Sequence, residues 1–110
     1  MGNNEYLSVR IDSKLKSDFY NFCQNSGISV SAAVNMLARK CIDIGSLPFI
    51  VNVVDYDTKQ GGVSLRISIR MKKEIRDGFS TICDRIGVPM STVVKMFMLQ
   101  CVDKDCFPFT

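Results

Sequence analysis

The sequence contains no histidine, although its 110 residues include five cysteines. The cysteines form no CxxC pair, and without histidine their spacing does not supply the four ligands of a structural zinc site. An odd number of cysteines also argues against a framework of disulfides. Glycine-rich phosphate loops and nucleophile–base pairs are missing too, so we expect no metal, no cofactor and no enzymatic activity. We expect a partly exposed Cys106 at a helix end or in a turn, and buried, reduced thiols at four positions, which are Cys23, Cys41, Cys83 and Cys101.

Long apolar runs are absent as well. No stretch approaches the roughly 18–20 apolar residues that a membrane-spanning helix needs. The first five residues, MGNNE, have neither the basic region nor the apolar run of a signal peptide. The 46% of hydrophobic residues is nevertheless enough for a packed core. We therefore expect a folded cytoplasmic protein that has no membrane partner.

An excess of charge is also lacking, because the net charge is only +3. Residues 1–60 carry six Lys or Arg and six Asp or Glu, whereas residues 61–110 carry eight and five. A balance of this size does not by itself indicate a nucleic-acid partner. Only the positions of the charged residues can indicate such a partner.

What the sequence does contain is an internal repeat. Shifted by 60 residues, residues 6–50 align with residues 66–110 without a gap, and 12 of the 45 pairs are identical. This match predicts a duplication. A unit of this size is too small to bury a good core alone, so two units must pair, either within one chain or between chains. We expect unit 1 at residues 1–49, a connector at 50–62 and unit 2 at 63–110.

Each unit is predicted to contain one strand and two helices. Apolar and polar residues alternate over residues 6–11 and 66–71, which is typical of a half-buried strand. The expected inward-facing residues are Leu7, Val9, Ile11, Ile67, Ile69 and Met71. Apolar residues then recur at helical spacing over about 13–26, 30–44, 73–86 and 90–104. The expected apolar stripes are Leu15, Phe19, Phe22 and Cys23; Val30, Ala33, Val34, Leu37, Ala38, Cys41 and Ile42; Ile75, Phe79, Ile82, Cys83 and Ile86; and Met90, Val93, Val94, Phe97, Met98, Cys101 and Val102.

Residues with special backbone preferences mark the expected helix ends. Asp12 and Ser29 are natural N-caps, whereas Lys72, the counterpart of Asp12, leaves its helix without a side-chain cap. Gly27 and Gly87 are expected to end the two first helices. The fold class that follows is mainly α with a short β-ribbon: two units forming an intramolecular pseudo-dimer, with a two-stranded antiparallel ribbon over four helices.

The polar face of the ribbon is a candidate DNA-reading surface. Its residues are Tyr6, Ser8, Arg10, Arg66, Ser68 and Arg70. A two-stranded ribbon fits the major groove of B-DNA, where arginine is the usual bidentate partner of guanine. Pairing centred on Ser8 and Ser68 would set Tyr6 opposite Arg70 and Arg10 opposite Arg66. The alternative is the solvated face of an ordinary strand, but the same pattern occurs twice, each time before the same pair of helices.

The starts of the second helices are candidate phosphate contacts, because free backbone amides and the helix dipole suit an anion. The candidates are the backbone amides of Val30, Ser31, Met90 and Ser91, the hydroxyl of Ser29, and the side chains of Lys72 and Lys73. The alternatives are simple helix capping for the first set and solvated surface charge for the lysines.

Each unit resembles the ribbon-helix-helix superfamily of Arc and MetJ repressors, and the second is especially similar to RelB/DinJ-type antitoxins. In the second unit the resemblance lies in Arg70-Met71, in the run 87–92 (GVPMST), in 96–100 (MFMLQ) and in 107–109 (FPF). The first unit has RID at 10–12, GISVS at 27–31 and LPF at 47–49.

The resemblance implies base reading by the outward strand residues and phosphate clamping by the second helices. RelB/DinJ-like antitoxins carry one such unit followed by a toxin-wrapping tail, whereas this chain has two units and the connector. We therefore expect a DNA-binding transcriptional regulator, a repressor, that binds double-stranded DNA and self-associates on DNA or as a dimer. The alternative is an antitoxin that binds a protein toxin and autoregulates its operon.

Overall fold

The computed structural model describes residues 4–49 and 63–108. In chain order the elements are β1 (Asn4–Asp12), α1 (Ser13–Ser26), α2 (Val30–Ile44), β2 (Ser64–Lys72), α4 (Lys73–Ile86) and α5 (Met90–Lys104). The predicted helix ranges are confirmed, and each strand is longer than predicted by two residues at its start and one at its end. The last three elements follow the first three at an offset of 60 residues. The expected connector at 50–62 lies outside the described residues.

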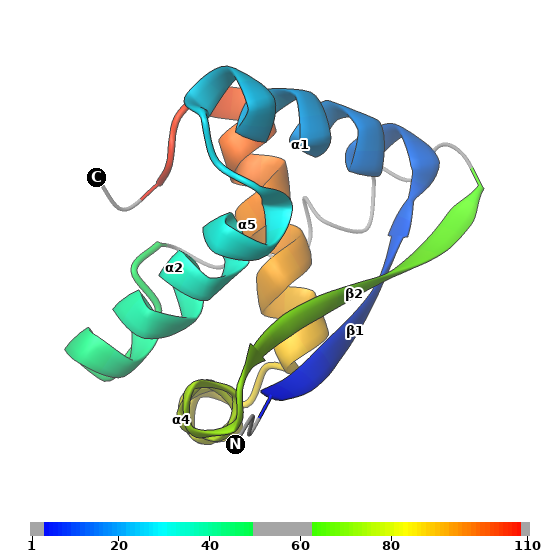
Figure 1. Ribbon diagram of the computed structural model, residues 1–110. Coiled ribbons are helices and arrows are strands. Elements are labelled where there is room, and N and C mark those ends of the chain that lie inside the picture. The colour runs from blue at the N-terminus through cyan, green and yellow to red at the C-terminus, as the bar shows by residue number, and fades with distance from the viewer. Residues whose placement is uncertain (1–3, 50–62, 109–110) are drawn as a thin grey trace.

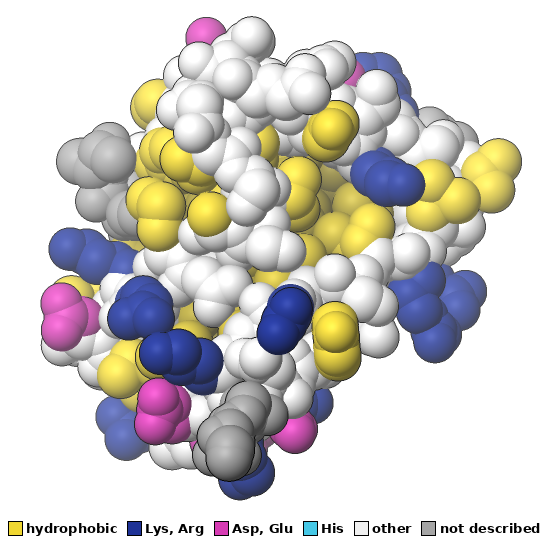
Figure 2. Space-filling model, viewed as in Figure 1, with side chains coloured by type: hydrophobic (Ala, Val, Ile, Leu, Met, Phe, Trp, Pro, Cys, Tyr) yellow, Lys and Arg dark blue, Asp and Glu magenta, His cyan; other side chains and the backbone are white. Residues whose placement is uncertain are grey.

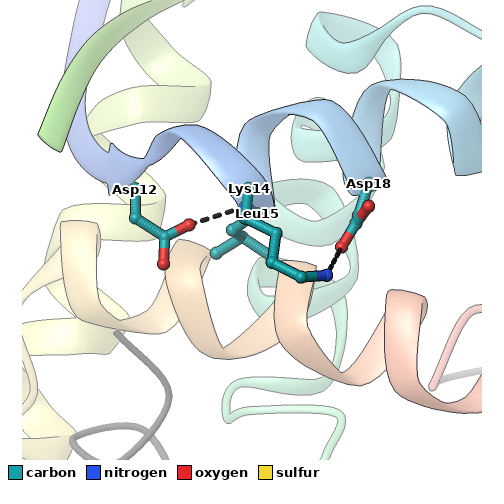
Figure 3. A network of polar contacts seen from close by, with 4 residues as sticks. All are labelled: Asp12, Lys14, Leu15 and Asp18. Atoms are coloured by element: carbon teal, nitrogen blue, oxygen red, sulfur yellow. Dashed lines mark hydrogen bonds and ion pairs between the residues drawn. The ribbon is translucent and has the colours of Figure 1, made fainter. Parts of the chain in front are cut away.

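The helix ends follow from local chemistry. The Asp12 carboxylate accepts a hydrogen bond from the backbone N–H of Leu15 at 2.6 Å and caps α1 (Figure 3). The Ser29 hydroxyl does the same for α2 through Ala32 N at 3.1 Å. As expected, Lys72 gives α4 no side-chain cap. Gly27 and Gly87 adopt the left-handed conformation that ends a helix, with φ of 78° and 87°.

The two described strands form an antiparallel ribbon within one chain, and the four described helices lie on one side of it (Figure 1). The register pairs Ser8 with Ser68, Tyr6 with Arg70 and Arg10 with Arg66. This is the register that pairing about the two serines requires. Alternate strand side chains therefore point either toward the helices or away from them.

The core interleaves the two halves of the chain. Helix α2 packs against β2 and α4, and helix α5 packs against β1 and α1. Each second helix thus contacts the strand and first helix that belong to the other half. The core contains an aromatic cluster in which the rings of Phe22 and Phe107 lie edge to face at 5.0 Å. Its residues are Phe19, Phe22, Phe49, Phe97 and Phe107.

Several apolar residues expected inside are less buried than predicted: Ile42 and Ile86 are exposed, and Val30, Ile67, Ile75, Met90 and Val102 are half-buried. Ile67 is only half-buried, because it lines a surface hollow beside β2. Ile42 is 38% exposed and lies over Gly78, and Ile86 is 40% exposed at the last position of α4. Conversely, Met96 is buried although it lies off the expected stripe. Spacing alone identifies the face of a helix but not how far its neighbours cover it.

The thiols are placed as expected. Cys23, Cys41, Cys83 and Cys101 are buried and reduced, and Cys106 is exposed. Burial in the apolar core raises the pKa of Cys23 and Cys83 to about 11 and that of Cys41 and Cys101 to about 12.

The described helices are 14 or 15 residues long. No single helix among them is long and apolar enough to cross a bilayer. Helices α4 and α5 reach that length and composition only when taken together, and they are bent by 92° at their junction.

Candidate nucleic-acid interface

The outward face of the ribbon brings all six predicted base-reading residues together. Each of them is exposed, and they are Tyr6, Ser8, Arg10, Arg66, Ser68 and Arg70. Their inward neighbours Leu7, Val9 and Ile69 are buried under the helices. The burial contrast arises because strand side chains alternate, so the packed core holds the polar face outward. The result is a twisted two-stranded surface that presents three guanidinium groups and three hydroxyl groups.

One of these side chains is held by neighbours that sequence reasoning missed. With the side-chain amide of Asn4 turned so that its oxygen faces Arg70, that oxygen accepts from Nη2 at 2.7 Å and from Nε at 3.3 Å. The Asn35 amide Nδ2 donates to the carbonyl oxygen of Arg70 at 2.9 Å and to that of Ser31 at 2.8 Å. Arg70 is thus fixed through both its side chain and its backbone. The polar alternation of the strand extends back to Asn4, so the sequence could have indicated that Asn4 lies on the same face of the ribbon as Arg70.

The start of α2 lies beside β2. The first helical bond of α2 runs from Ala33 N to the Ser29 carbonyl at 3.0 Å, so the amides of Val30 and Ser31 precede the helical ladder. Both residues are half-buried and line the same hollow as Ser68. The Ser29 hydroxyl caps the helix as an acceptor, which leaves its own O–H as a donor.

The start of α5 has a different chemistry. Pro89 occupies the N-cap position and makes no side-chain cap bond, and Val93 N bonds to the Pro89 carbonyl at 3.1 Å. Met90 and Ser91 are half-buried and precede that first helical bond. Since α5 packs against β1, the two predicted amide sets lie beside opposite strands of the ribbon.

The two predicted lysines differ in their surroundings. Lys72 is the last residue of β2 and is exposed. Lys73 Nζ donates to Asp77 at 2.9 Å, and this hydrogen bond, with the charge of the carboxylate, raises the pKa of Lys73. Lys14 and Asp18 form the corresponding exposed pair on α1 at 2.8 Å (Figure 3). A phosphate would have to compete with Asp77 for Lys73, whereas Lys72 makes no such ion pair among the described residues.

A hollow of about 250 Å³ lies between β2, α1 and the start of α2. In Figure 2 its apolar floor is visible between the ribbon and the helices, with Lys and Arg side chains nearby. Phe19, Ile67 and Met98 contribute to the floor, and Lys16 and Tyr20 to the rim. Neither rim residue was among the predicted site residues. Both residues lie outside the predicted apolar stripe of α1, and helical spacing does not predict a surface hollow.

The described residues contain no group of three or more Cys, Asp or Glu side chains that could hold a metal ion. The outward face of the ribbon and the helix starts beside it offer hydrogen-bond donors, positive charge and backbone amides. These groups suit recognition of a polyanion whose exposed edges carry hydrogen-bond donors and acceptors.

Comparison with known proteins places the chain in a family. A model of the RelB antitoxin family matches residues 4–60, slightly more than half of the 110 residues. The match falls on the first half of the chain, whereas the sequence motifs predict a stronger resemblance in the second half. No curated protein and no solved structure matches the chain significantly. Because a family model covers more than half of its length, the chain belongs to the RelB antitoxin family.

Proposed function

We propose that this chain binds double-stranded DNA sequence-specifically, with its ribbon in the major groove, and acts as a transcriptional repressor without enzymatic activity. The observation that carries the proposal is the exposure of all six polar side chains on one face of the antiparallel ribbon. A ribbon of this kind fits the major groove, where arginine and serine reach base edges.

The proposal includes two ribbon-helix-helix units that pair within one chain. It is supported by the offset of 60 residues between the halves and by the contacts of α2 with β2 and of α5 with β1. In this arrangement, the starts of α2 and α5 flank the ribbon and contact phosphates through Val30, Ser31, Met90 and Ser91. The hydroxyl of Ser29 and the side chains of Lys72 and Lys73 add further phosphate contacts. Chains associate on adjacent DNA sites or as a dimer.

The test is a salt-dependent titration with random duplex and with the DNA upstream of the protein's own gene. The wild type is compared with the triple variant Arg10→Ala/Arg66→Ala/Arg70→Ala. Each lost guanine contact costs about 1–3 kcal/mol of discrimination, so the variant should no longer distinguish the upstream DNA from random duplex. Wild-type affinity should fall steeply with salt.

A matched control removes the same three charges elsewhere. Arg39, Arg85 and Lys104 are exposed and lie on helices rather than on the ribbon. Arg39→Ala/Arg85→Ala/Lys104→Ala should keep the preference for the upstream DNA, and circular dichroism should show both variants folded. Equal loss of preference in the two variants would show that the preference depends on net charge and not on the ribbon arginines. Wild-type protein that binds neither duplex at low salt would contradict DNA binding.

A second function is favoured by the family match: neutralisation of a protein toxin, with autoregulation of the operon. Co-expression with the product of a neighbouring gene tests it. Rescue of growth, together with a stable complex on size-exclusion chromatography, would support an antitoxin. Unrestored growth and separate elution of the two proteins would contradict it.

A further inference from the structure

The two ends of the ribbon are chemically different. At one end Arg10 lies directly opposite Arg66, and at the other end Tyr6 lies opposite Arg70. Two identical chains related by symmetry would present the same residues at both ends. Here both strands belong to one chain, so the difference is built into every molecule.

The Arg10–Arg66 end concentrates positive charge. Directly opposite residues on one face of an antiparallel pair have Cβ atoms about 4.5–5.5 Å apart, and like charges there repel each other. Within the described residues, neither guanidinium has a hydrogen bond or ion pair. The two guanidinium groups therefore keep their N–H donors for a ligand. Together they can bind two adjacent guanines, since each guanine offers the O6 and N7 acceptors in the major groove.

The Tyr6–Arg70 end is already partly engaged. Asn4 occupies the Nε and Nη2 side of the Arg70 guanidinium. The residue 60 positions later, Ser64, lies opposite Asp12 near the other end and has a side chain too short for the same role. Tyr6 is 61% exposed and offers one hydroxyl and an apolar ring. This end therefore has donors for one guanine and a ring surface that suits the thymine methyl group.

We propose that the operator is directional: two adjacent G·C pairs lie under the Arg10–Arg66 end, and one G·C pair beside an A·T pair lies under the Tyr6–Arg70 end. The chain then binds in one orientation. This inference rests on the proposed DNA binding and goes beyond it by naming the base composition of each half-site and the polarity of binding.

Selection from a randomised duplex library tests the half-sites. Wild-type protein should enrich a non-palindromic motif. Arg10→Ala/Arg66→Ala should lose discrimination at the two-guanine half alone, on the order of 10- to 100-fold, and Tyr6→Ala/Arg70→Ala at the other half alone. Enrichment by the wild type of a motif that is palindromic within the site of a single ribbon, or loss at both halves in either variant, would overturn the inference.

Orientation is measured separately with a tethered DNA-cleaving reagent. Cys106 is the exposed thiol, so a Cys106→Ser background leaves the four buried thiols unreactive in the folded state. Ser64→Cys, at the start of β2, and Glu74→Cys, in the first turn of α4 just after the other end of β2, then carry an iron–EDTA group at two exposed positions. Each should cleave one end of the selected duplex, and the two should cleave opposite ends.

The outcomes separate the two proposals. Cleavage by each derivative at both ends of a tightly bound duplex would contradict a fixed orientation and leave DNA binding intact. Failure of unlabelled wild-type protein to bind any duplex in the selection would contradict the proposed function itself.

Discussion

At the scale of single residues, the second helices of the two halves end in different amino acids that share a left-handed backbone conformation. Helices α2 and α5 both end in a left-handed residue, which is Gly45 in the first and Asp105 in the second, with φ of 72° and 54°. Glycine adopts this conformation without strain, whereas a residue with a Cβ does not. Asp105 also places a carboxylate at the negative end of the helix dipole.

We expect Asp105→Gly to stabilise the protein by about 1 kcal/mol, because it removes both penalties. Gly45→Asp is the matched control and should destabilise it by a similar amount. Urea denaturation followed by circular dichroism measures both changes. A stabilised Gly45→Asp variant would show that backbone strain does not govern these positions.

At the scale of elements, the first helices of the two halves differ at their N-termini. Helix α1 is capped by Asp12, while α4 begins after Lys72, whose backbone is extended with φ of −67° and ψ of 146° but whose side chain caps nothing. This backbone matches that of Asp12, at φ of −78° and ψ of 161°. The geometry for a cap is therefore present in α4 without the side chain.

Exchange of these caps gives a prediction in two directions. Asp12→Ala should lower the free energy of unfolding by about 1 kcal/mol, and Lys72→Asp should raise it by a similar amount. Thermal unfolding without DNA measures both. Lys72→Asp should also weaken DNA binding, because it replaces a proposed phosphate contact with a negative charge. Lys72→Ala controls for loss of the lysine and should not stabilise the helix.

At the scale of the whole molecule, four buried thiols lie in a core shared by both halves. The unfolded chain releases its thiol protons above the ordinary pKa of 9.0, whereas the folded chain holds them until about pH 11 to 12. The folded state thus binds more protons in this interval. The resulting contribution to stability is complete below pH 9 and is lost as the pH rises through the folded values.

We therefore expect the free energy of unfolding to fall between pH 9 and pH 11, as measured by urea titration at a series of pH values. Cys41→Ala/Cys101→Ala should be less stable at pH 7, because it leaves small cavities, but should lose less stability over that interval. Cys106→Ser should follow the wild type. Parallel curves for the double variant and the wild type would show that the buried thiols do not cause the decline.

The sequence by itself determined the local structure of this protein. Alternation and helical spacing located both strands and all four described helices, because these signals depend on neighbours within a few positions. Asp12, Ser29, Gly27 and Gly87 marked four of the helix ends. The alternation also identified the six outward residues and, through pairing about Ser8 and Ser68, which side chains face each other. These parts of the candidate interface were predictable from the sequence.

Only the tertiary structure decided what depends on residues far apart in the chain. It paired β1 with β2 in one molecule, brought Asn4 and Asn35 to Arg70, and left Ile67 at a hollow while Leu7 is buried. Periodicity reports which face of an element is apolar, but coverage and side-chain contacts depend on how the elements pack. The Tyr6–Arg70 and Arg10–Arg66 pairs were predictable from the sequence, whereas the contact of Asn4 with Arg70, which further distinguishes the two ends of the ribbon, depends on the packed structure.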